Sequence, residues 1–195
     1  MQNTIDSYIK SIKTVLENIS ESSVLTIVEL LLNARQENKT IYVMGNGGSG
    51  LAASHFVADI GKSASYGKDK KFKVVCLNDN MSMVMSYAND VDYSKIFVEQ
   101  LKNFLCAGDI VIGFSGSGNS QNVLNAIEYA NKNGAITVGF TGYDGGKLGK
   151  LAKYTLNSKI NDIQISEDFH LMMIHLIMKI INNLDEKKIT LKPVY

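Results

Sequence analysis

Serine and glycine alternate in the segment SGSGNS (115–120), which follows the β-prone run DIVIGF and precedes a helical stretch at about 121–132. Glycines let a backbone approach a ligand closely, and hydroxyls, backbone N–H groups and a helix N-terminus together form a neutral cradle for an anion. Ser120 also suits the N-cap of that helix, but capping explains a single serine. We therefore expect this loop to bind a monophosphate dianion through Ser115, Ser117 and Ser120.

A second glycine-rich loop, GNGGSG (45–50), follows the β-prone run TIYVM and formally matches the dinucleotide-binding pattern G-x-G-x-x-G. In that pattern an acidic residue about 20 positions further on binds the ribose, whereas the next strand-end acid here, Asp79, comes 29 residues after Gly50. Neither loop contains the lysine of a nucleoside triphosphate loop. A nucleotide cofactor is therefore not expected, and the first loop is either part of a ligand site or a tight turn.

Histidine and carboxylate side chains recur at helical spacings. His55 and Asp59 are four residues apart in a predicted helix, so they share one face and could address one ion or one substrate. The alternative for His55 is a hydrogen-bonded helix histidine without a functional role. His170 precedes His175 by five residues in the last predicted helix and therefore points in another direction, which favours a structural role for His170.

The segments that position these side chains alternate between strand and helix. Apolar strands are predicted at 40–44, 72–77, 109–114 and 135–140, with a weaker fifth at 154–156. Near-continuous apolar strands alternating with helices are typical of a parallel sheet covered on both faces, in the α/β class. Ligands of such sheets bind at the carboxyl ends of the strands, where both glycine-rich loops lie.

Helices are predicted on either side of this core. Residues 4–19 place apolar side chains three and four apart, which predicts a helix with one apolar stripe formed by Ile5, Ile9, Ile12, Leu16 and Ile19. Further helices are predicted at 24–35, 49–60 and 166–184. We expect one domain over 1–195, with residues 1–36 serving packing or oligomerisation and 37–195 forming the ligand-binding core. The tail ITLKPVY is expected to be a mobile end or to pack across a subunit.

Composition excludes several classes of partner. The 195 residues, 45% of them apolar, carry 20 basic and 19 acidic side chains, and a net charge of +1 offers no field for nucleic acid or acidic membranes. Two cysteines make neither a disulfide framework nor a CxxC metal site, which favours a reduced, cytoplasmic setting. No apolar run approaches the roughly 18 residues that span a bilayer. We expect a small-molecule partner and no membrane insertion.

Five motifs in order along the chain carry a family resemblance: GNGGSGLAASHF, SYAND, GFSGSGNSQNV, FTGYDGGKL and HLMMIH. Together they resemble the sugar isomerase (SIS) domain family and, within it, the sedoheptulose 7-phosphate isomerases, also called phosphoheptose isomerases. The resemblance implies a three-layer sandwich with a flavodoxin-like, five-stranded parallel sheet and extra N-terminal helices. It further implies a phosphosugar ligand, a homotetramer with active sites at subunit interfaces, and a role in bacterial heptose precursors for lipopolysaccharide or capsule.

The same resemblance assigns roles by position. Substrate contacts fall on Asn46, Gly47, Gly48, Ser49, Asn89, Asp90 and Glu167. Phosphate contacts fall on Ser115, Gly116, Ser117 and Ser120. Metal ligands fall on His55, Asp59, Glu167 and His175. Asp59 would also be the catalytic carboxylate and His175 the acid or base.

This chain departs from the family pattern at two of the four metal positions. Asp59 stands where the most similar isomerases usually have Glu, Glu167 stands where they usually have Gln, and Lys62 lies near the place of a common arginine. Two imidazoles and two carboxylates suit Zn²⁺. Glu167 and His175, however, are eight residues apart, about 12 Å along a helix axis, so shared ligation needs both side chains to lean together. Bound zinc and an empty site both stay open.

Three functions are compatible with these residues. The first is an aldose–ketose isomerase, which moves a proton from the carbon beside a carbonyl to the neighbouring carbon through an enediolate and is expected to convert sedoheptulose 7-phosphate to a heptose 7-phosphate. The alternative is a non-catalytic phosphosugar-binding or regulatory protein, such as the relatives that bind the replication initiator. The third, a nucleotide-dependent oxidoreductase, is disfavoured by the missing ribose-binding acid.

Overall fold

The computed structural model describes residues 2–187, so the tail ITLKPVY and the expectation for it lie outside the described residues. Five parallel strands form one sheet in the order β2-β1-β3-β4-β5. This order is the flavodoxin-like one, which confirms the predicted α/β class. The weak fifth strand is present at the sheet edge. The strands are β1 (Thr40–Gly45), β2 (Lys73–Cys76), β3 (Ile110–Ser115), β4 (Ile136–Thr141) and β5 (Tyr154–Asn157).

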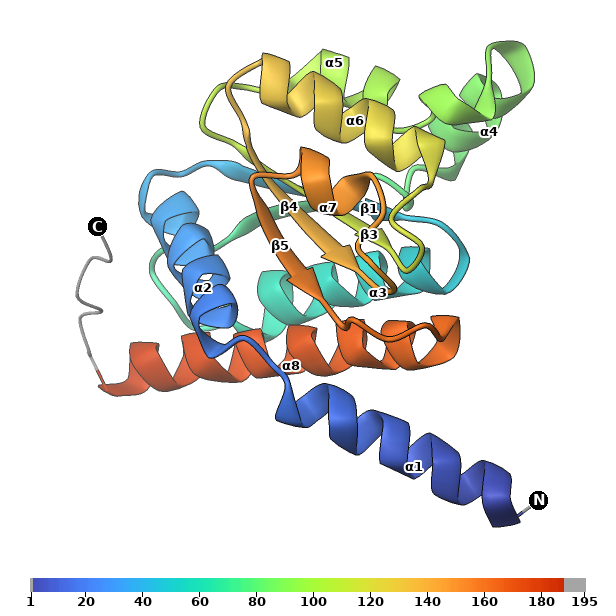
Figure 1. The fold of residues 1–195 in the computed structure, drawn as a ribbon. Helices are drawn as coiled ribbons and strands as arrows, with labels where there is room; N and C mark the ends of the chain where they lie inside the picture. Colours follow the sequence, from blue (N-terminus) through green and yellow to red (C-terminus); the bar gives the residue numbers. More distant parts are fainter. Residues whose placement is uncertain (1, 188–195) are drawn as a thin grey trace.

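Helices cover both faces of the sheet and complete three layers, as Figure 1 shows. One face is covered by α2 (Glu21–Gln36), α3 (Gly47–Ala58) and α8 (Ile163–Lys187). The other is covered by α5 (Val98–Phe104), α6 (Gln121–Lys132) and α7 (Leu148–Leu151). Among residues 2–187, no helix is both long and apolar enough to cross a bilayer.

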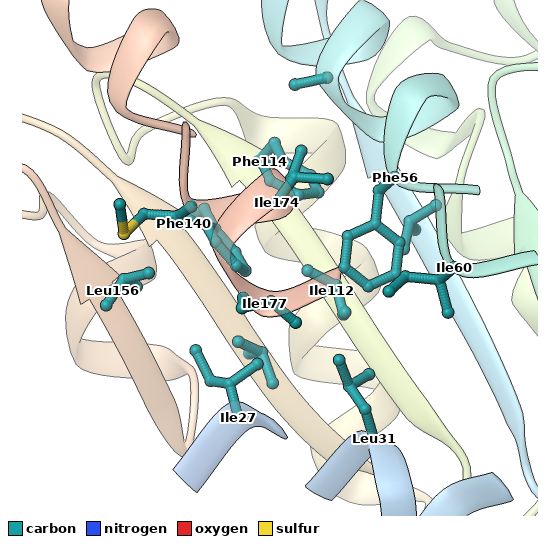
Figure 2. Packing of buried hydrophobic residues seen from close by; sticks show 14 of the residues in the cluster. Ile27, Leu31, Phe56, Ile60, Ile112, Phe114, Phe140, Leu156, Ile174 and Ile177 are labelled. Atoms are coloured by element: carbon teal, nitrogen blue, oxygen red, sulfur yellow. The ribbon is translucent and has the colours of Figure 1, made fainter. Parts of the chain in front are cut away.

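The core divides into two clusters because alternate residues of the central strands face opposite sides of the sheet. In β3, Ile112 and Phe114 enter the cluster beneath α2, α3 and α8, whereas Val111 enters the one beneath α5 and α6. Figure 2 shows Phe114 and Phe140 side by side in the first cluster, with their ring centroids 4.5 Å apart. These two cores hold the strands whose carboxyl ends carry the glycine-rich loops.

The N-terminal helix α1 (Gln2–Glu17) carries the predicted apolar stripe but extends away from the body of the molecule (Figure 1). Within α1, all of which the structure describes, Val15 is the sole buried residue, while Ile5 is 53% and Ile9 46% exposed. The hydroxyl of Tyr8 contacts the carboxylate of Asp168 on α8. Most of the stripe is therefore uncovered within a single chain.

Four helices begin earlier than the sequence pattern predicts, and two of them, α1 at Gln2 and α2 at Glu21, do so by two and three residues. The helix expected from residue 49 starts at Gly47, and after Ala58 it continues as a π-helical turn, η1 (Asp59–Ser63). The helix expected from residue 166 starts at Ile163, because the side chain of Asp162 accepts a hydrogen bond from the backbone N–H of Ile165 at 3.1 Å. π-Helical turns are often found at functional sites, and this one begins at a predicted catalytic residue.

His170 is fully buried. Burial agrees with the structural role that its five-residue offset from His175 predicts. Its Nε2 lies 3.2 Å from the carbonyl oxygen of Thr141, and its ring packs edge-on against Phe140 with centroids 6.0 Å apart. Burial lowers the pKa of His170 from 6.5 to about 4. The folded protein therefore keeps this ring neutral at pH values where the unfolded chain protonates it.

This difference predicts an acid-labile fold. Between pH 6.5 and about 4 the unfolded chain binds a proton that the folded chain does not, so the free energy of unfolding falls as the pH falls. The full loss is on the order of 3 kcal/mol, and this group adds nothing further below its folded pKa. Urea unfolding of the wild type and of His170→Phe at pH 7 and pH 4.5 measures this loss of unfolding free energy. Equal acid losses in the two proteins would contradict the assignment to His170.

Candidate active site

The two glycine-rich loops lie side by side at the carboxyl edge of the sheet. Strands β1 and β3 are hydrogen-bonded neighbours in which Gly45 pairs with Phe114, so the loops that leave these strands emerge together. The first loop leads directly into α3 and the second into α6. The predicted placement of both loops is therefore confirmed, and two helix N-termini meet at one edge.

In the second loop the hydroxyls of Ser115 and Ser120 lie 3.1 Å apart. Ser117 is exposed, and its Oγ accepts a hydrogen bond from the backbone N–H of Asn119 at 3.2 Å. Gly118 has φ +66°, and a side-chain carbon there would overlap the carbonyl oxygen of Gly145, so the loop requires glycine at this position. The three predicted serines thus belong to one compact turn that packs on the loop after β4.

Ser120 occupies the N-cap position of α6, but among the described residues its side chain makes no capping hydrogen bond. Its hydroxyl instead faces Ser115. The capping interpretation therefore fails for the side chain of Ser120. This hydroxyl, paired with Ser115 and not with its own helix, stays a predicted phosphate contact.

Replacing Ser120 with alanine tests this difference. Loss of a hydrogen bond to a charged ligand is expected to weaken sugar phosphate binding roughly tenfold or more. Loss of a capping bond would instead cost about 1 kcal/mol of stability, or roughly 2–4 °C in Tm for a chain of this size. Calorimetric titration with sedoheptulose 7-phosphate and a thermal melt separate the two. A lower Tm with unchanged affinity would restore the capping role.

The first loop brings Gly48 against α8. A side-chain carbon at Gly48 would overlap the carboxylate of Glu167, so the absence of a side chain makes room for this acid. Gly47 has φ +53°, and Ser49 is buried in the first turn of α3. Of the predicted substrate residues in this loop, Gly48 therefore lies beside Glu167.

Two further predicted contacts, Asn89 and Asp90, lie in the last turn of α4 (Met81–Asp90). Both are exposed, and the Nδ2 of Asn89 donates to the Oδ1 of Asp90 at 2.8 Å. Within the described part of the chain, no hydrogen bond joins either side chain to the glycine-rich loops. The hydrogen bond that these side chains make is therefore to each other, at the end of α4.

A cluster of two imidazoles and one carboxylate forms where α3 passes into η1 beside α8. The Nε2 atoms of His55 and His175 lie 2.7 Å apart, and the Oδ2 of Asp59 lies 3.5 Å from the first and 3.8 Å from the second. The imidazole side chains are 40% and 50% exposed, whereas that of Asp59 is 13% exposed. We call these three residues the His–Asp cluster. His55 and Asp59 share one helix face, as their spacing predicts.

The donor set of the His–Asp cluster fits a divalent metal ion. One ligand atom from each residue can be chosen so that all three lie within 4.8 Å of one another. Zinc bonds of about 2.0–2.1 Å at tetrahedral angles place neighbouring donors about 3.3 Å apart, a value that the three observed separations bracket. The Oδ2 of Asp59 is buried and accepts no hydrogen bond from the described residues. A bound cation would be the partner that this buried oxygen lacks.

Glu167 does not join the His–Asp cluster. It was expected as a fourth ligand, but its carboxylate packs against Gly48, and the cluster of potential ligands within residues 2–187 consists of the other three. The eight-residue spacing along α8 explains this separation, because it corresponds to about 12 Å of helix rise. Glu167 thus lies at the glycine-loop end of the site and His175 lies further along the helix.

The structure adds residues that the sequence pattern missed. Asn78 anchors the first loop, because its Oδ1 accepts from the N–H of Gly45 at 3.2 Å and its Nδ2 donates to the Gly45 carbonyl at 2.7 Å. The carboxamide of Asn46 pairs with that of Asn122 and also contacts Tyr93. Asn122 lies within the motif GFSGSGNSQNV, which is the one sequence signal that pointed to it.

Comparison with known proteins agrees with this geometry. A family model described as the SIS domain matches residues 7–142. The chain is 34% identical to a probable phosphoheptose isomerase of Thermoplasma acidophilum over 171 residues, which are 87% of this chain and 91% of the relative. It is also 34% identical to the phosphoheptose isomerase of Aliarcobacter butzleri over 183 residues, 93% of this chain and 92% of the relative.

Solved structures of phosphoheptose isomerases also resemble this chain. A phosphoheptose isomerase from Neisseria gonorrhoeae superposes with a TM-score of 0.85 at 27% identity, covering 93% of this chain and 98% of the other. A phosphoheptose isomerase from Francisella tularensis gives the same TM-score at 22% identity and supports the fold. The family model, these relatives and the sheet order agree, and the chain belongs to the SIS domain family.

Proposed function

We propose that the protein is an aldose–ketose isomerase that interconverts sedoheptulose 7-phosphate and a heptose 7-phosphate. Its similarity to phosphoheptose isomerases over most of both chains supports this substrate. The observation that carries the proposal is the His–Asp cluster, which places two half-exposed imidazoles beside a largely buried carboxylate on helices that also line the glycine loops.

Isomerisation needs a group that removes a proton from the carbon beside the carbonyl and returns it to the neighbouring carbon. We assign this proton transfer to His175, with Asp59 as the carboxylate that orients and supports it at 3.8 Å. The hydroxyls of the second loop and the N-terminus of α6 hold the substrate phosphate. His55, Asp59 and His175 would hold a divalent ion such as Zn²⁺, which when bound supplies Lewis-acid polarisation of a sugar oxygen.

We further propose a cytoplasmic homotetramer that serves heptose precursor synthesis for lipopolysaccharide or capsule. The apolar stripe on α1 supports self-association, because Ile5, Ile9 and Leu16 are 53%, 46% and 39% exposed in a single chain. Residues 2–36 then act as packing helices, and the following residues act as the phosphosugar-binding core. Light scattering of the wild type and of Ile5→Asp measures the assembly.

The direct test is incubation with sedoheptulose 7-phosphate, with added zinc and with a chelator, followed by detection of the aldose phosphate. Product formation in either condition supports the isomerase, and loss of product on chelation assigns a role to the metal. Absence of product at every zinc concentration would overturn the proposal.

A non-catalytic phosphosugar-binding protein is the second candidate. It is favoured by the shorter carboxylate at Asp59, since a displacement of roughly 1 Å can lower a rate on the order of a hundredfold. It is also favoured by the position of Glu167 outside the His–Asp cluster. Calorimetric binding of sedoheptulose 7-phosphate without turnover would select this function.

A further inference from the structure

The side chain of Asn46 forms a three-way junction. Its Oδ1 accepts hydrogen bonds from the Nδ2 of Asn122 at 2.8 Å and from the hydroxyl of Tyr93 at 3.1 Å. Its Nδ2 donates to the Oδ1 of Asn122 at 2.9 Å, so the two carboxamides pair in both directions. Asn122 is 2% exposed and Tyr93 is 55% exposed. We call these three residues the amide junction.

The amide junction joins three segments that are far apart in the sequence. Asn46 lies between β1 and α3, in the first glycine loop. Asn122 is the second residue of α6, directly after the phosphate loop. Tyr93 begins the 3₁₀ turn η2 (Tyr93–Lys95), three residues after Asp90 at the end of α4. One side chain therefore links the first loop, the phosphate loop and the segment that follows α4.

Asn46 forms these contacts instead of capping its own helix. It holds the N-cap position of α3 with φ −114° and ψ 148°, yet no capping bond from its side chain is found among the described residues. An asparagine at this position ordinarily accepts a hydrogen bond from the first turn. Ser120 similarly leaves α6 without a side-chain cap. At both helix N-termini of this edge, the N-cap side chain therefore leaves the backbone N–H groups of the first turn without a capping hydrogen bond.

We propose that Asn122 and Tyr93 are positioning residues that act through Asn46. By fixing the first loop to the phosphate loop, they set the separation between the phosphate and the start of α3, the helix that carries His55 and leads into Asp59. This inference rests on the proposed isomerase function. The phosphate contacts themselves do not depend on the junction, so its loss is expected to lower kcat more than it raises KM.

Tyr93→Phe removes one hydroxyl at a half-exposed position and preserves the ring. We expect kcat/KM for sedoheptulose 7-phosphate to fall about fivefold, as for the loss of a neutral hydrogen bond. Asn46→Ala is expected to cause a larger loss, because it breaks both arms of the junction. In the Asn46→Ala background, adding Tyr93→Phe should then change nothing further, since the hydroxyl no longer has its acceptor.

The matched control is Tyr129→Phe on α6, whose hydroxyl has no hydrogen bond to the described residues, and it should retain wild-type rates. Additive losses in the double variant, or unchanged kinetics of Tyr93→Phe, would overturn the role of the junction while leaving the isomerase intact. If the wild type shows no turnover, the same cycle is measured on the Kd for sedoheptulose 7-phosphate. Coupling seen in Kd without any turnover would support the positioning role of the amide junction and contradict the isomerase function. Absence of both binding and turnover would contradict both proposals.

Discussion

Replacing His175 with glutamine is expected to lower kcat for sedoheptulose 7-phosphate by about 10²- to 10⁴-fold, the contribution typical of a general acid or base. Glutamine keeps hydrogen-bonding capacity but cannot exchange a proton near neutral pH. The imidazole of His175 is half exposed, and its Nε2 is within 3.8 Å of the Asp59 carboxylate. It therefore combines access to substrate with a neighbouring carboxylate. The affinity for sugar phosphate should stay unchanged, because in the proposed function the loop after β3, and not His175, binds the phosphate.

Solvent exchange provides the sharper measurement. In D₂O the wild type should incorporate deuterium at the carbon that loses its proton, and His175→Gln should not, whether or not product accumulates. Lys179→Gln, an exposed position one turn further along α8, is the control and should exchange at the wild-type rate. Deuterium incorporation by His175→Gln at a rate near that of the wild type would remove His175 from the proton transfer.

Local signals were sufficient to predict the sheet and the positions of the two glycine-rich loops. Each central strand is a short, β-prone apolar run that ends in glycine, serine or threonine, and this pattern depends on a few adjacent residues. The helix predicted at 121–132 has those bounds in the structure, because it begins after a clear loop. The alternation of strands and helices then restricts the connections to right-handed crossovers of a parallel sheet.

The start of α3 at Gly47 could not be predicted in the same way. Glycine disfavours a helix by about 1 kcal/mol relative to alanine, so propensity placed the start at Ser49. Tertiary packing overrides this preference, because Gly48 lies against the carboxylate of Glu167 on α8, a helix that is far away in the sequence. At Gly48 the absence of a side chain leaves the space that this carboxylate occupies.

The candidate site was predictable only where its residues are close in sequence. His55 and Asp59 share a helix face, and that pairing follows from their spacing. The approach of His175, 120 residues from His55, and the approach of Asn122, 76 residues from Asn46, depend on how the helices pack on the sheet. Glu167, which was assigned a ligand role by position alone, lies outside the group that the packing brings together, His55, Asp59 and His175.

The second large effect is expected at Asp59. Its Oδ2 is buried without a hydrogen bond from residues 2–187, and it lies 3.5 Å from the Nε2 of His55. A buried carboxylate oxygen without a partner costs stability, and a bound cation would offset that cost. Asp59→Asn keeps the size of the side chain but removes the charge. We expect zinc affinity to fall roughly a hundredfold or more, since one of three charged or strong donors is replaced by a weak one.

The same substitution should have the opposite effect on the metal-free protein. Because asparagine does not bury a charge, the free energy of unfolding in the presence of a chelator should rise by about 1 kcal/mol. Zinc titration and thermal melts with and without chelator measure the two effects. Asp79→Asn is the control, because Asp79 is exposed and accepts a hydrogen bond from Ser54, next to His55, at 2.6 Å. Unchanged zinc affinity together with a lower metal-free Tm would mean that Asp59 stabilises the fold and does not hold a metal ion. A higher metal-free Tm together with a lower zinc affinity would show that the buried charge of Asp59 destabilises the fold and that its carboxylate binds the metal ion.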